Sequence, residues 1–360
     1  MRLASRMDRI GTETAFEAAA RARALEATGV DVVHLEVGEP DFDTPANIRA
    51  AAKQALDEGK THYAPFAGIP ELRAAIADDA TARKGFPVSP DQVFVTVGGK
   101  GVMLYAIEAL VDDGDEVIVP DPGYPIYESL VSWIGGSAIP IPIRQANGFR
   151  LDPDELASLV TPRTRMIVLA DEIYGRILYE GEHVSIASLP GMAERTVVLD
   201  GFSKTYAMTG WRLGYAIVPE WLAFAFGRLI INSVSNVCSF AQHGAVEALR
   251  GPQDEVDKMV AEFHARRDLV VDGLNAIPGI SCLRPSGAFY VLPQVSGTGL
   301  TGTELSTRLL YEAGVSTLAG TAFGGVATDH IRLSYATSQA NIRTALDRIG
   351  QFVGMLAVSA

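Results

Sequence analysis

The chain has 360 residues, 48% of them hydrophobic, and its 30 basic and 43 acidic residues give a formal net charge of −13. Glycine and proline are frequent but aperiodic, which excludes a disordered, collagen-like or coiled-coil protein and indicates an ordinary globular chain. No basic stripe runs along it, so binding to nucleic acid or to an anionic membrane is disfavoured. At this length we expect one large α/β domain and a smaller one.

The amino-terminal half predicts an arm followed by two helices. A helix is expected over 14–28, a short strand over 32–37, and a turn-forming stretch over 38–45. Two helical patterns follow over 46–59 and 71–85, the second opened by Pro70 as a first-turn proline. The loop between them, around Tyr63, is rich in aromatic residues and glycine.

Strand and helix patterns then alternate, which predicts βαβ units and a mostly parallel sheet flanked by helices. From residue 280 the pattern changes to that of a smaller α+β lobe. The expected domains are an arm over 1–45 that belongs to the small domain, a large domain over 46–275 and a small domain over 276–360. The strands are expected at 92–97, 115–120, 137–143, 163–179, 195–204, 212–219, 280–285, 288–293 and 330–336, and the helices at 98–110, 124–135, from Pro153, at 253–274, 302–312 and from Gln339.

Targeting and metal signals are absent from the sequence. No stretch approaches ~18 consecutive apolar residues, and the amino terminus lacks the apolar run of a secretory signal. Cys238 and Cys282 form no C-x-x-C pair, and the six histidines have no metal-binding spacing. We therefore expect a cytoplasmic protein without a metal site or a membrane span.

Lys204 stands in the stretch GFSKTYAMTGWRLGY, which contains no acid and whose next cation is Arg212. Such surroundings predict partial burial, and burial lowers the pKa of a lysine. A neutral amine is what Schiff-base chemistry with a carbonyl compound requires, so Lys204 is a candidate nucleophile. For this stretch taken alone, a structural lysine reaching out of a loop is the preferred reading.

Two other strand ends carry residues of interest, because ligands of open α/β sheets bind beyond the carboxyl ends of the strands. Gly98, Gly99 and Lys100 open a helix after an apolar strand, which suits a phosphate, although a plain tight turn would look the same. Asp171 ends another apolar run, followed by Tyr174. The acid could face a pyridinium nitrogen or cap the following turn.

Together, a phosphate cradle, a carboxylate for a ring nitrogen and a desolvated lysine indicate pyridoxal 5'-phosphate better than any one of them does. The chain resembles a class I/II aminotransferase of the fold type I pyridoxal-phosphate-dependent family over nearly its whole length. SKTYAMTGWRLGY matches that family's lysine signature, and LEVGEPDFDTP, HYAPFAGIPELR, VTVGGKG, PGYPIYE, DEIYGRILY, GAFYVLP and IRLSYATS match its other landmarks in order.

The resemblance implies roles around the cofactor ring. Lys204 would form the internal aldimine and carry the proton between the substrate Cα and the cofactor. Asp171 would keep the ring nitrogen protonated. Tyr174 would hydrogen-bond the phenolic oxygen and Tyr124 would stack on the ring face. Without the resemblance, aromatic core packing would be the preferred reading of the three tyrosines, Tyr63 included.

The resemblance also implies how the phosphate and the substrate are bound. Arg332 would bind the substrate α-carboxylate with its planar fork, and Gly38 would supply a backbone N–H near it. Tyr63 would reach the phosphate of the neighbouring subunit, which makes a homodimer part of the site. The phosphate would be held by Gly98, Gly99, Lys100 and Arg212.

The chain departs from the family between Leu169 and Asp171. The family normally has an Asn-Pro-Thr-Gly loop, a crossover helix and a further strand there, but RTRMIVL runs directly into ADEIY. A parallel crossover needs a dozen or more residues, so one strand and its helix are expected to be missing. Three explanations remain: a segment of the real chain is omitted, the gene encodes a degenerate protein, or the deletion was engineered. We favour the first, because losing an internal strand exposes two sheet edges.

The resulting prediction is an amino-acid:2-oxo-acid transaminase that works by a ping-pong mechanism. No second arginine marks a dicarboxylate substrate, so aromatic or neutral aliphatic amino acids stay possible. The alternatives are a pyridoxal-phosphate-dependent C–S lyase of the same fold and a non-catalytic paralogue disabled by the missing segment.

Overall fold

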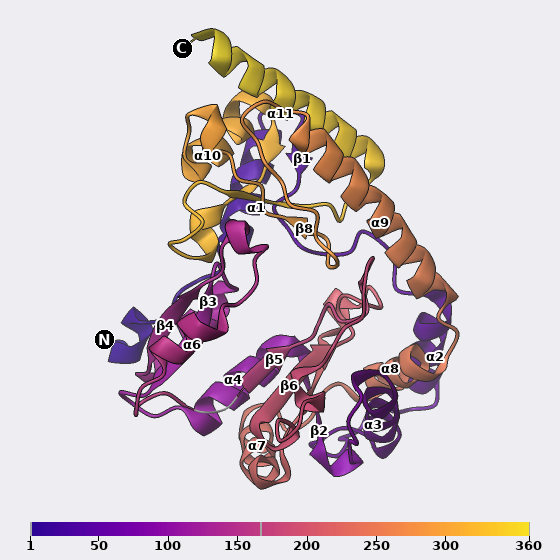
Figure 1. Cartoon of the computed structure of the whole chain (residues 1–360). Helices are drawn as coiled ribbons and strands as arrows, with labels where there is room; N and C mark the ends of the chain where they lie inside the picture. Colours follow the sequence, from indigo (N-terminus) through magenta and orange to yellow (C-terminus); the bar gives the residue numbers. More distant parts are fainter. Residues whose placement is uncertain (1, 166–167, 360) are drawn as a thin grey trace. The chain divides into compact units, whose positions relative to one another are not determined.

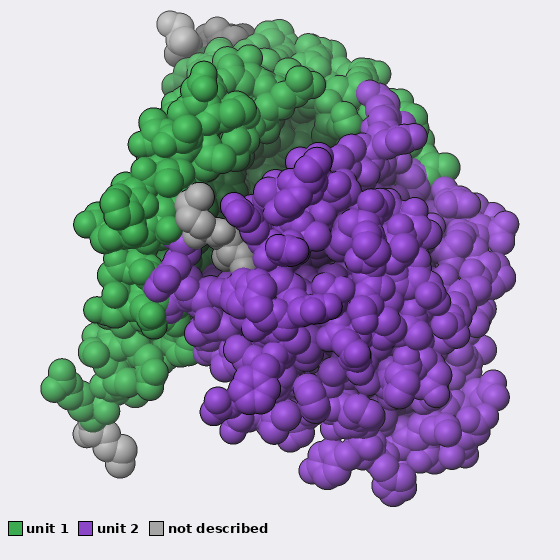
Figure 2. All heavy atoms as spheres, turned by 60° about the horizontal axis from the view of Figure 1, so that its bottom comes forward, with its two compact units in different colours: residues 1–41, 112–164, 261–360 green, residues 42–111, 165–260 purple. Residues whose placement is uncertain are grey.

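The computed structural model describes residues 2–165 and 168–359. The chain divides into two compact units, coloured separately in Figure 2: unit 1 consists of residues 1–41, 112–164 and 261–360, and unit 2 of residues 42–111 and 165–260. Each unit is described by itself.

Figure 1 labels the helices and strands of the described chain. The helices are α1 Thr14–Glu26, α2 Ala46–Asp57, α3 Pro70–Lys84, α4 Gly98–Leu110, α5 Pro125–Ile134, α6 Pro153–Leu159, α7 Glu220–Ser233, α8 Ser239–Arg250, α9 Asp254–Asn275, α10 Gly302–Ala313 and α11 Gln339–Ser359. The strands are β1 Val33–His34, β2 Val93–Val97, β3 Glu116–Asp121, β4 Ser137–Pro142, β5 Val168–Asp171, β6 Thr196–Gly201, β7 Leu213–Ile217, β8 Tyr290–Val291, β9 Val315–Ser316, β10 Leu318–Ala319 and β11 Ile331–Ser334.

Unit 2 is built on a four-stranded sheet in the order β2-β7-β6-β5, in which β5 and β6 are parallel and β7 is antiparallel to β2 and β6. Successive side chains of a strand point to opposite faces. Accordingly, Val198 lies in the core shared with α3 and α8, whereas Leu199 lies against Gly99 of α4. Both faces of the sheet are therefore covered by helices.

Unit 1 contains three smaller sheets. β10, β11 and β8 form an antiparallel sheet, and β1 pairs in parallel with β9. β3 pairs in parallel with β4 over six residue pairs. Helix α10 packs against α11 and against β9, β10 and β11. This is the α+β lobe that the sequence predicted, joined in the same unit by the β3–β4 pair.

The stretch that leads into β5 contacts one strand in each unit. Thr164 makes a parallel bridge with Glu116 at the start of β3, and Val168–Asp171 pairs with Thr196–Leu199 of β6. Residues 166 and 167, which belong to the strand predicted over 163–179, lie outside the described residues. In the described part of the chain, β5 has β6 as its one neighbour and β3–β4 is a separate sheet.

The α/β fold class is confirmed by the structure, and most predicted elements are present near their expected bounds. The strand predicted over 280–285 is wrong, because Ser281 makes a single bridge to Gln294. Asn275 explains this: its side-chain amide bonds both the N–H and the C=O of Cys282, at 2.9 and 3.0 Å, in place of a neighbouring strand. The sequence-based domain bounds stay a prediction.

Candidate active site

Four candidate residues of unit 2 lie at one edge of its sheet. Gly98 follows β2, and Asp171 ends β5. Lys204 comes shortly after the end of β6, and Arg212 precedes β7, which runs in the opposite direction and so begins at the same edge. β2 and β5 are three strand spacings apart, about 14 Å. The topology therefore brings these four residues to one edge, as the sequence predicted.

The amino terminus of α4 forms an anion-sized cradle with Arg212. Gly98 has φ of 68°, and a Cβ added to it would overlap Arg212 Nη2. The guanidinium is held there because Arg212 Nη1 donates to the Thr209 carbonyl at 2.7 Å, while the Gly98 N–H donates to the Arg212 carbonyl at 3.1 Å. The dipole of a helix amino terminus and a guanidinium together suit a phosphate dianion. Gly99 is half-buried in the first turn, and Lys100 is exposed on it.

Lys204 lies in a loop that is mostly buried. Its neighbours Phe202, Ser203, Thr205 and Tyr206 are each buried, and Lys204 itself is half-buried. The loop is fixed by backbone hydrogen bonds, including that from the Tyr206 N–H to the Phe202 carbonyl at 3.2 Å. The predicted partial burial of Lys204 is therefore confirmed, whereas its chemical role is not tested by the geometry alone.

Asp171 is exposed, in contrast to the sheltered acid that the apolar run suggested. Its Oδ1 accepts a hydrogen bond from the Ile173 N–H at 3.2 Å, which is the turn-capping role that the sequence left open. Tyr174 is half-buried in the same turn, and its carbonyl accepts from the Ile177 N–H at 2.9 Å.

Tyr63 is 91% exposed. Aromatic core packing, the simpler reading of this residue, is therefore excluded. An almost fully exposed tyrosine in a glycine-rich loop is available to a neighbouring molecule.

In unit 1, Arg332 on β11 lies between two aromatic rings. Its guanidinium carbon is 4.7 Å from the ring centre of Tyr290 and 5.0 Å from that of Phe323, and Nη2 donates to the Glu36 carbonyl. A Cβ on Gly38 would overlap the Tyr290 hydroxyl, so only glycine fits there. Stacking and the carbonyl bond orient the guanidinium plane, as bidentate recognition of a carboxylate requires.

Tyr124 belongs to the same part of unit 1. The neighbouring Gly123 N–H donates to the Phe323 carbonyl at 2.7 Å. The Tyr124 hydroxyl donates to Glu13 Oε2 at 3.0 Å, and its ring makes an edge contact with Tyr127. A series of contacts therefore connects Tyr124, through Gly123 and Phe323, to Arg332 within unit 1.

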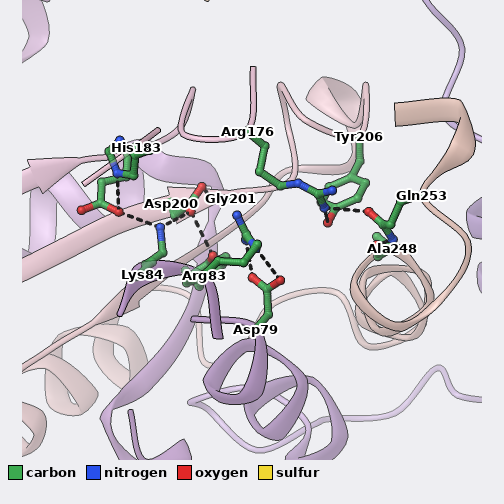
Figure 3. Close-up of polar contacts among 12 residues, drawn as sticks. Asp79, Arg83, Lys84, Arg176, His183, Asp200, Gly201, Tyr206, Ala248 and Gln253 are labelled. Carbon is green, nitrogen blue, oxygen red and sulfur yellow. Dashed lines mark hydrogen bonds and ion pairs between the residues drawn. The ribbon is translucent and has the colours of Figure 1, made fainter. Parts of the chain in front are cut away.

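Sequence reasoning missed a buried charged cluster in unit 2, formed by Lys84, Glu172 and Asp200 (Figure 3), which we call the Lys84 cluster. Lys84 Nζ lies 2.7 Å from Glu172 Oε2 and 2.7 Å from Asp200 Oδ2. Burial lowers the pKa of Lys84, but the charges of Asp200 and Glu172 outweigh it and raise that pKa. Burial raises the pKa of Glu172, but bonds to His183 and Lys84 outweigh it and hold the pKa at about 2. Lys84 and Glu172 are therefore held in their charged forms.

The described residues contain neither a candidate metal-binding cluster nor a helix that could span a membrane. No group of three or more histidine, cysteine, aspartate or glutamate side chains there could hold a metal ion. No helix in that part of the chain is long and apolar enough to cross a membrane.

The comparisons with known proteins agree with this geometry. The family model for aminotransferase class I and II matches residues 30–168 and 154–349. An arginine–pyruvate transaminase of Pseudomonas aeruginosa is 39% identical over 360 positions, covering 91% of this chain and 92% of its own. An aspartate aminotransferase of Geobacillus stearothermophilus is 36% identical, covering 98% and 99%. The solved structure of the aspartate aminotransferase from Rhizobium meliloti has a TM-score of 0.94 at 35% identity, covering 98% of this chain and 99% of its own.

Fold and sequence thus define an α/β enzyme that transfers amino groups. The chain belongs to the aminotransferase class I and II family, and it is an aminotransferase. The resemblance read from the sequence motifs is confirmed.

The same comparisons show that this chain lacks positions that a relative has. The Geobacillus alignment extends over 391 positions, and this chain has 360 residues, so 31 or more of those positions have no residue here. The two ranges matched by the family model overlap at 154–168, directly before β5.

Proposed function

We propose that this aminotransferase uses pyridoxal 5'-phosphate, bound through Lys204, to move an amino group from an L-amino acid to a 2-oxo acid in ping-pong order. The observation that carries the proposal is the cradle at the start of α4, where the Arg212 guanidinium occupies the space that a side chain on Gly98 would fill. When bound, the cofactor supplies an electrophilic carbon and a ring that withdraws electrons from the substrate Cα.

The residues of unit 2 would bind the cofactor and move protons. Lys204 would hold the cofactor covalently and carry the proton to and from the substrate Cα, since it emerges half-buried at the sheet edge that bears the cradle. Asp171 would keep a proton on the ring nitrogen, since it ends β5 at the sheet edge that bears the cradle. Tyr174 would orient the ring through its phenolic oxygen. The phosphate ligands would be Gly98, Gly99, Lys100 and Arg212.

The residues of unit 1 would bind the substrate. The Arg332 guanidinium, oriented by Tyr290 and Phe323, would take the α-carboxylate in a bidentate pair, and Gly38 would add its N–H. Tyr124 would stack on the cofactor ring, its orientation fixed by the bond to Glu13. Relatives act on aspartate and on arginine by name, so the proposal leaves the amino donor open.

We extend the proposal to a homodimer in the cytoplasm. The 91% exposure of Tyr63 supports its reaching the cofactor phosphate of a second copy. Both cysteines are free thiols, which suits a reducing compartment.

Replacing Lys204 with alanine tests the catalytic proposal. The wild type should transfer amino groups from at least one member of a panel of L-amino acids to 2-oxoglutarate or pyruvate, and Lys204→Ala should not. Ammonia release without an amino acceptor would instead indicate a C–S or related lyase. Equal transamination by both proteins would exclude Lys204 as the catalytic lysine.

We also propose that a crossover segment is missing next to Leu169. The alignment gap, the overlap of the two family-model ranges before β5 and the separate β3–β4 sheet support this. If the segment is absent from the protein itself, the second candidate function is a paralogue without catalysis. The intact mass of the protein from its natural source decides between the two readings: 38.4 kDa would mean that the gap is native, and a larger mass would mean that the present sequence omits a segment.

A further inference from the structure

The Lys84 cluster has no part in the reaction proposed above, yet its burial is nearly complete. The side chains of Lys84, Glu172 and Asp200 are 2%, 4% and 9% exposed. Taking three charges out of water is costly, and the cost is offset only when geometry and hydrogen bonding are good. The free-energy cost of burying these three side chains therefore calls for an explanation of what they do in this protein.

Hydrogen bonding in the cluster is complete at all four carboxylate oxygens. Glu172 Oε1 accepts from the Ser185 hydroxyl at 2.6 Å, and Glu172 Oε2 accepts from Lys84 Nζ. Asp200 Oδ1 accepts from the Gly201 N–H at 2.7 Å, and Asp200 Oδ2 accepts from Lys84 Nζ and from the Tyr215 hydroxyl at 3.1 Å. A polar network in which every carboxylate oxygen is bonded holds its members in one arrangement.

The two carboxylates belong to the two segments that carry the proposed chemistry. Glu172 directly follows Asp171 at the end of β5, and Asp200 lies in β6, four residues before Lys204. Figure 3 shows Lys84 reaching from α3 toward Asp200 on one side. His183, which contacts Glu172, lies on the other side of Lys84. Lys84 thus joins the Asp171 segment to the Lys204 segment through one ammonium group.

A second tether joins the same two segments. Arg176, two residues after Tyr174, donates from Nη1 to the hydroxyl of Tyr206 at 2.9 Å, and Tyr206 comes two residues after Lys204 (Figure 3). The Arg176 guanidinium carbon also lies 5.8 Å from the centre of the Tyr206 ring. Along the chain, Asp200 and Tyr206 flank Lys204, whereas Glu172 and Arg176 both follow Asp171.

The position of β5 in the sheet explains why tethers are needed. β5 has four residues, and within the described chain it pairs with β6 alone, from Val168↔Thr196 to Asp171↔Leu199. A short strand at a sheet edge opens more readily than one held on both sides. Asp171 is the last residue of that strand, so its backbone depends on whatever holds the next residue, Glu172.

We propose that Lys84 is a positioning residue, whose paired bonds to Glu172 and Asp200 hold Asp171 and Lys204 at the separation that the reaction requires. The inference rests on the proposed function, since it assumes that these two residues act on one cofactor. Lys84 would also act electrostatically. Without its ammonium, the buried carboxylates of Glu172 and Asp200 would remain unpaired with Lys84, in the segments that carry Asp171 and Lys204.

Lys84→Met in the cofactor-loaded protein tests the inference. Misplacement of reacting groups by about 1 Å costs up to roughly 100-fold in rate, so we expect kcat to fall roughly 10- to 100-fold while KM changes little. The pH midpoint of the visible absorption band should rise, because the carboxylates of Glu172 and Asp200, no longer paired with Lys84, would favour the protonated form of the linked Lys204 nitrogen. Lys258→Met, which removes a lysine from an exposed pair with Glu255, is the control and should change neither quantity.

A wild-type kcat and pH midpoint in folded Lys84→Met, with only the melting temperature lowered, would overturn the inference and leave Lys84 a structural residue. If Lys84→Met does not fold, the triple variant Lys84→Met, Glu172→Gln, Asp200→Asn removes all three charges together. A folded triple variant with low kcat supports positioning, and one with wild-type kcat refutes it. The proposed function fails separately, if borohydride does not attach the cofactor to Lys204 in the wild type.

Discussion

Gly98→Ala tests the phosphate cradle at the start of α4. Gly98 has φ of 68°, a conformation that costs an alanine about 1–2 kcal/mol. The added Cβ would also overlap Arg212 Nη2, so the guanidinium must move off the cradle. Losing one charge-assisted hydrogen bond costs about 1.5–3 kcal/mol, which corresponds to roughly 10- to 100-fold in affinity.

Gly148→Ala is the matched control for backbone strain. Gly148 has φ of 65°, nearly that of Gly98, but an added Cβ would meet nothing within 4 Å. Both variants should therefore lose similar stability, about 1–2 kcal/mol in urea titrations. Only Gly98→Ala should bind pyridoxal phosphate more weakly.

The assay is titration of each protein with pyridoxal phosphate and with pyridoxal, followed by visible absorbance. We expect Gly98→Ala to weaken binding of the phosphate ester roughly 10- to 100-fold and binding of pyridoxal little, because the proposed cradle would contact the phosphate alone. Equal weakening of both compounds, or wild-type affinity for the phosphate ester, would refute the cradle.

Three further predictions concern single side chains. Arg332→Lys keeps the charge but loses the planar fork, so KM for the amino donor should rise roughly 10- to 100-fold with little change in cofactor affinity; an unchanged KM would remove Arg332 from the substrate site. Glu172 has its pKa held at about 2, so its stabilising contribution is present above the ordinary value of 4.5 and is lost as the pH falls toward 2. The stability gap between wild type and Glu172→Gln should therefore shrink from pH 6 to pH 2.5 in urea titrations, and a constant gap would contradict the assignment. Tyr63→Ala should leave the melting temperature unchanged, because the side chain is 91% exposed, yet weaken cofactor binding; wild-type affinity would exclude a contact to the phosphate of a second copy.

Residues that follow apolar strands could be predicted from the sequence, because strand ends of an open sheet meet at a common edge. This reasoning brought Gly98, Asp171 and Lys204 together correctly, whereas Arg212 was placed with them by the family resemblance. It did not predict that Asp171 is exposed, since the run of apolar residues before it says nothing of how short an edge strand β5 is.

The Lys84 cluster could not be predicted, for a different reason. Lys84 stands in the last turn of α3, where a lysine ordinarily faces water and the helix dipole. Its partners Glu172 and Asp200 are 88 and 116 residues away in the chain. Asp200 inside the apolar run VVLDG was the one local sign of a buried charge. Its partner, Lys84, could be identified only from the way α3 packs on the sheet.

The central claim is that Lys204 of this aminotransferase binds pyridoxal phosphate covalently. The most direct measurement is the visible spectrum of the purified protein with pyridoxal phosphate, before and after L-amino acids, followed by borohydride reduction and peptide mapping. We expect an absorption band that an amino donor bleaches, and a reduced cofactor adduct on Lys204. Absence of the band, or an adduct on another lysine, would contradict it.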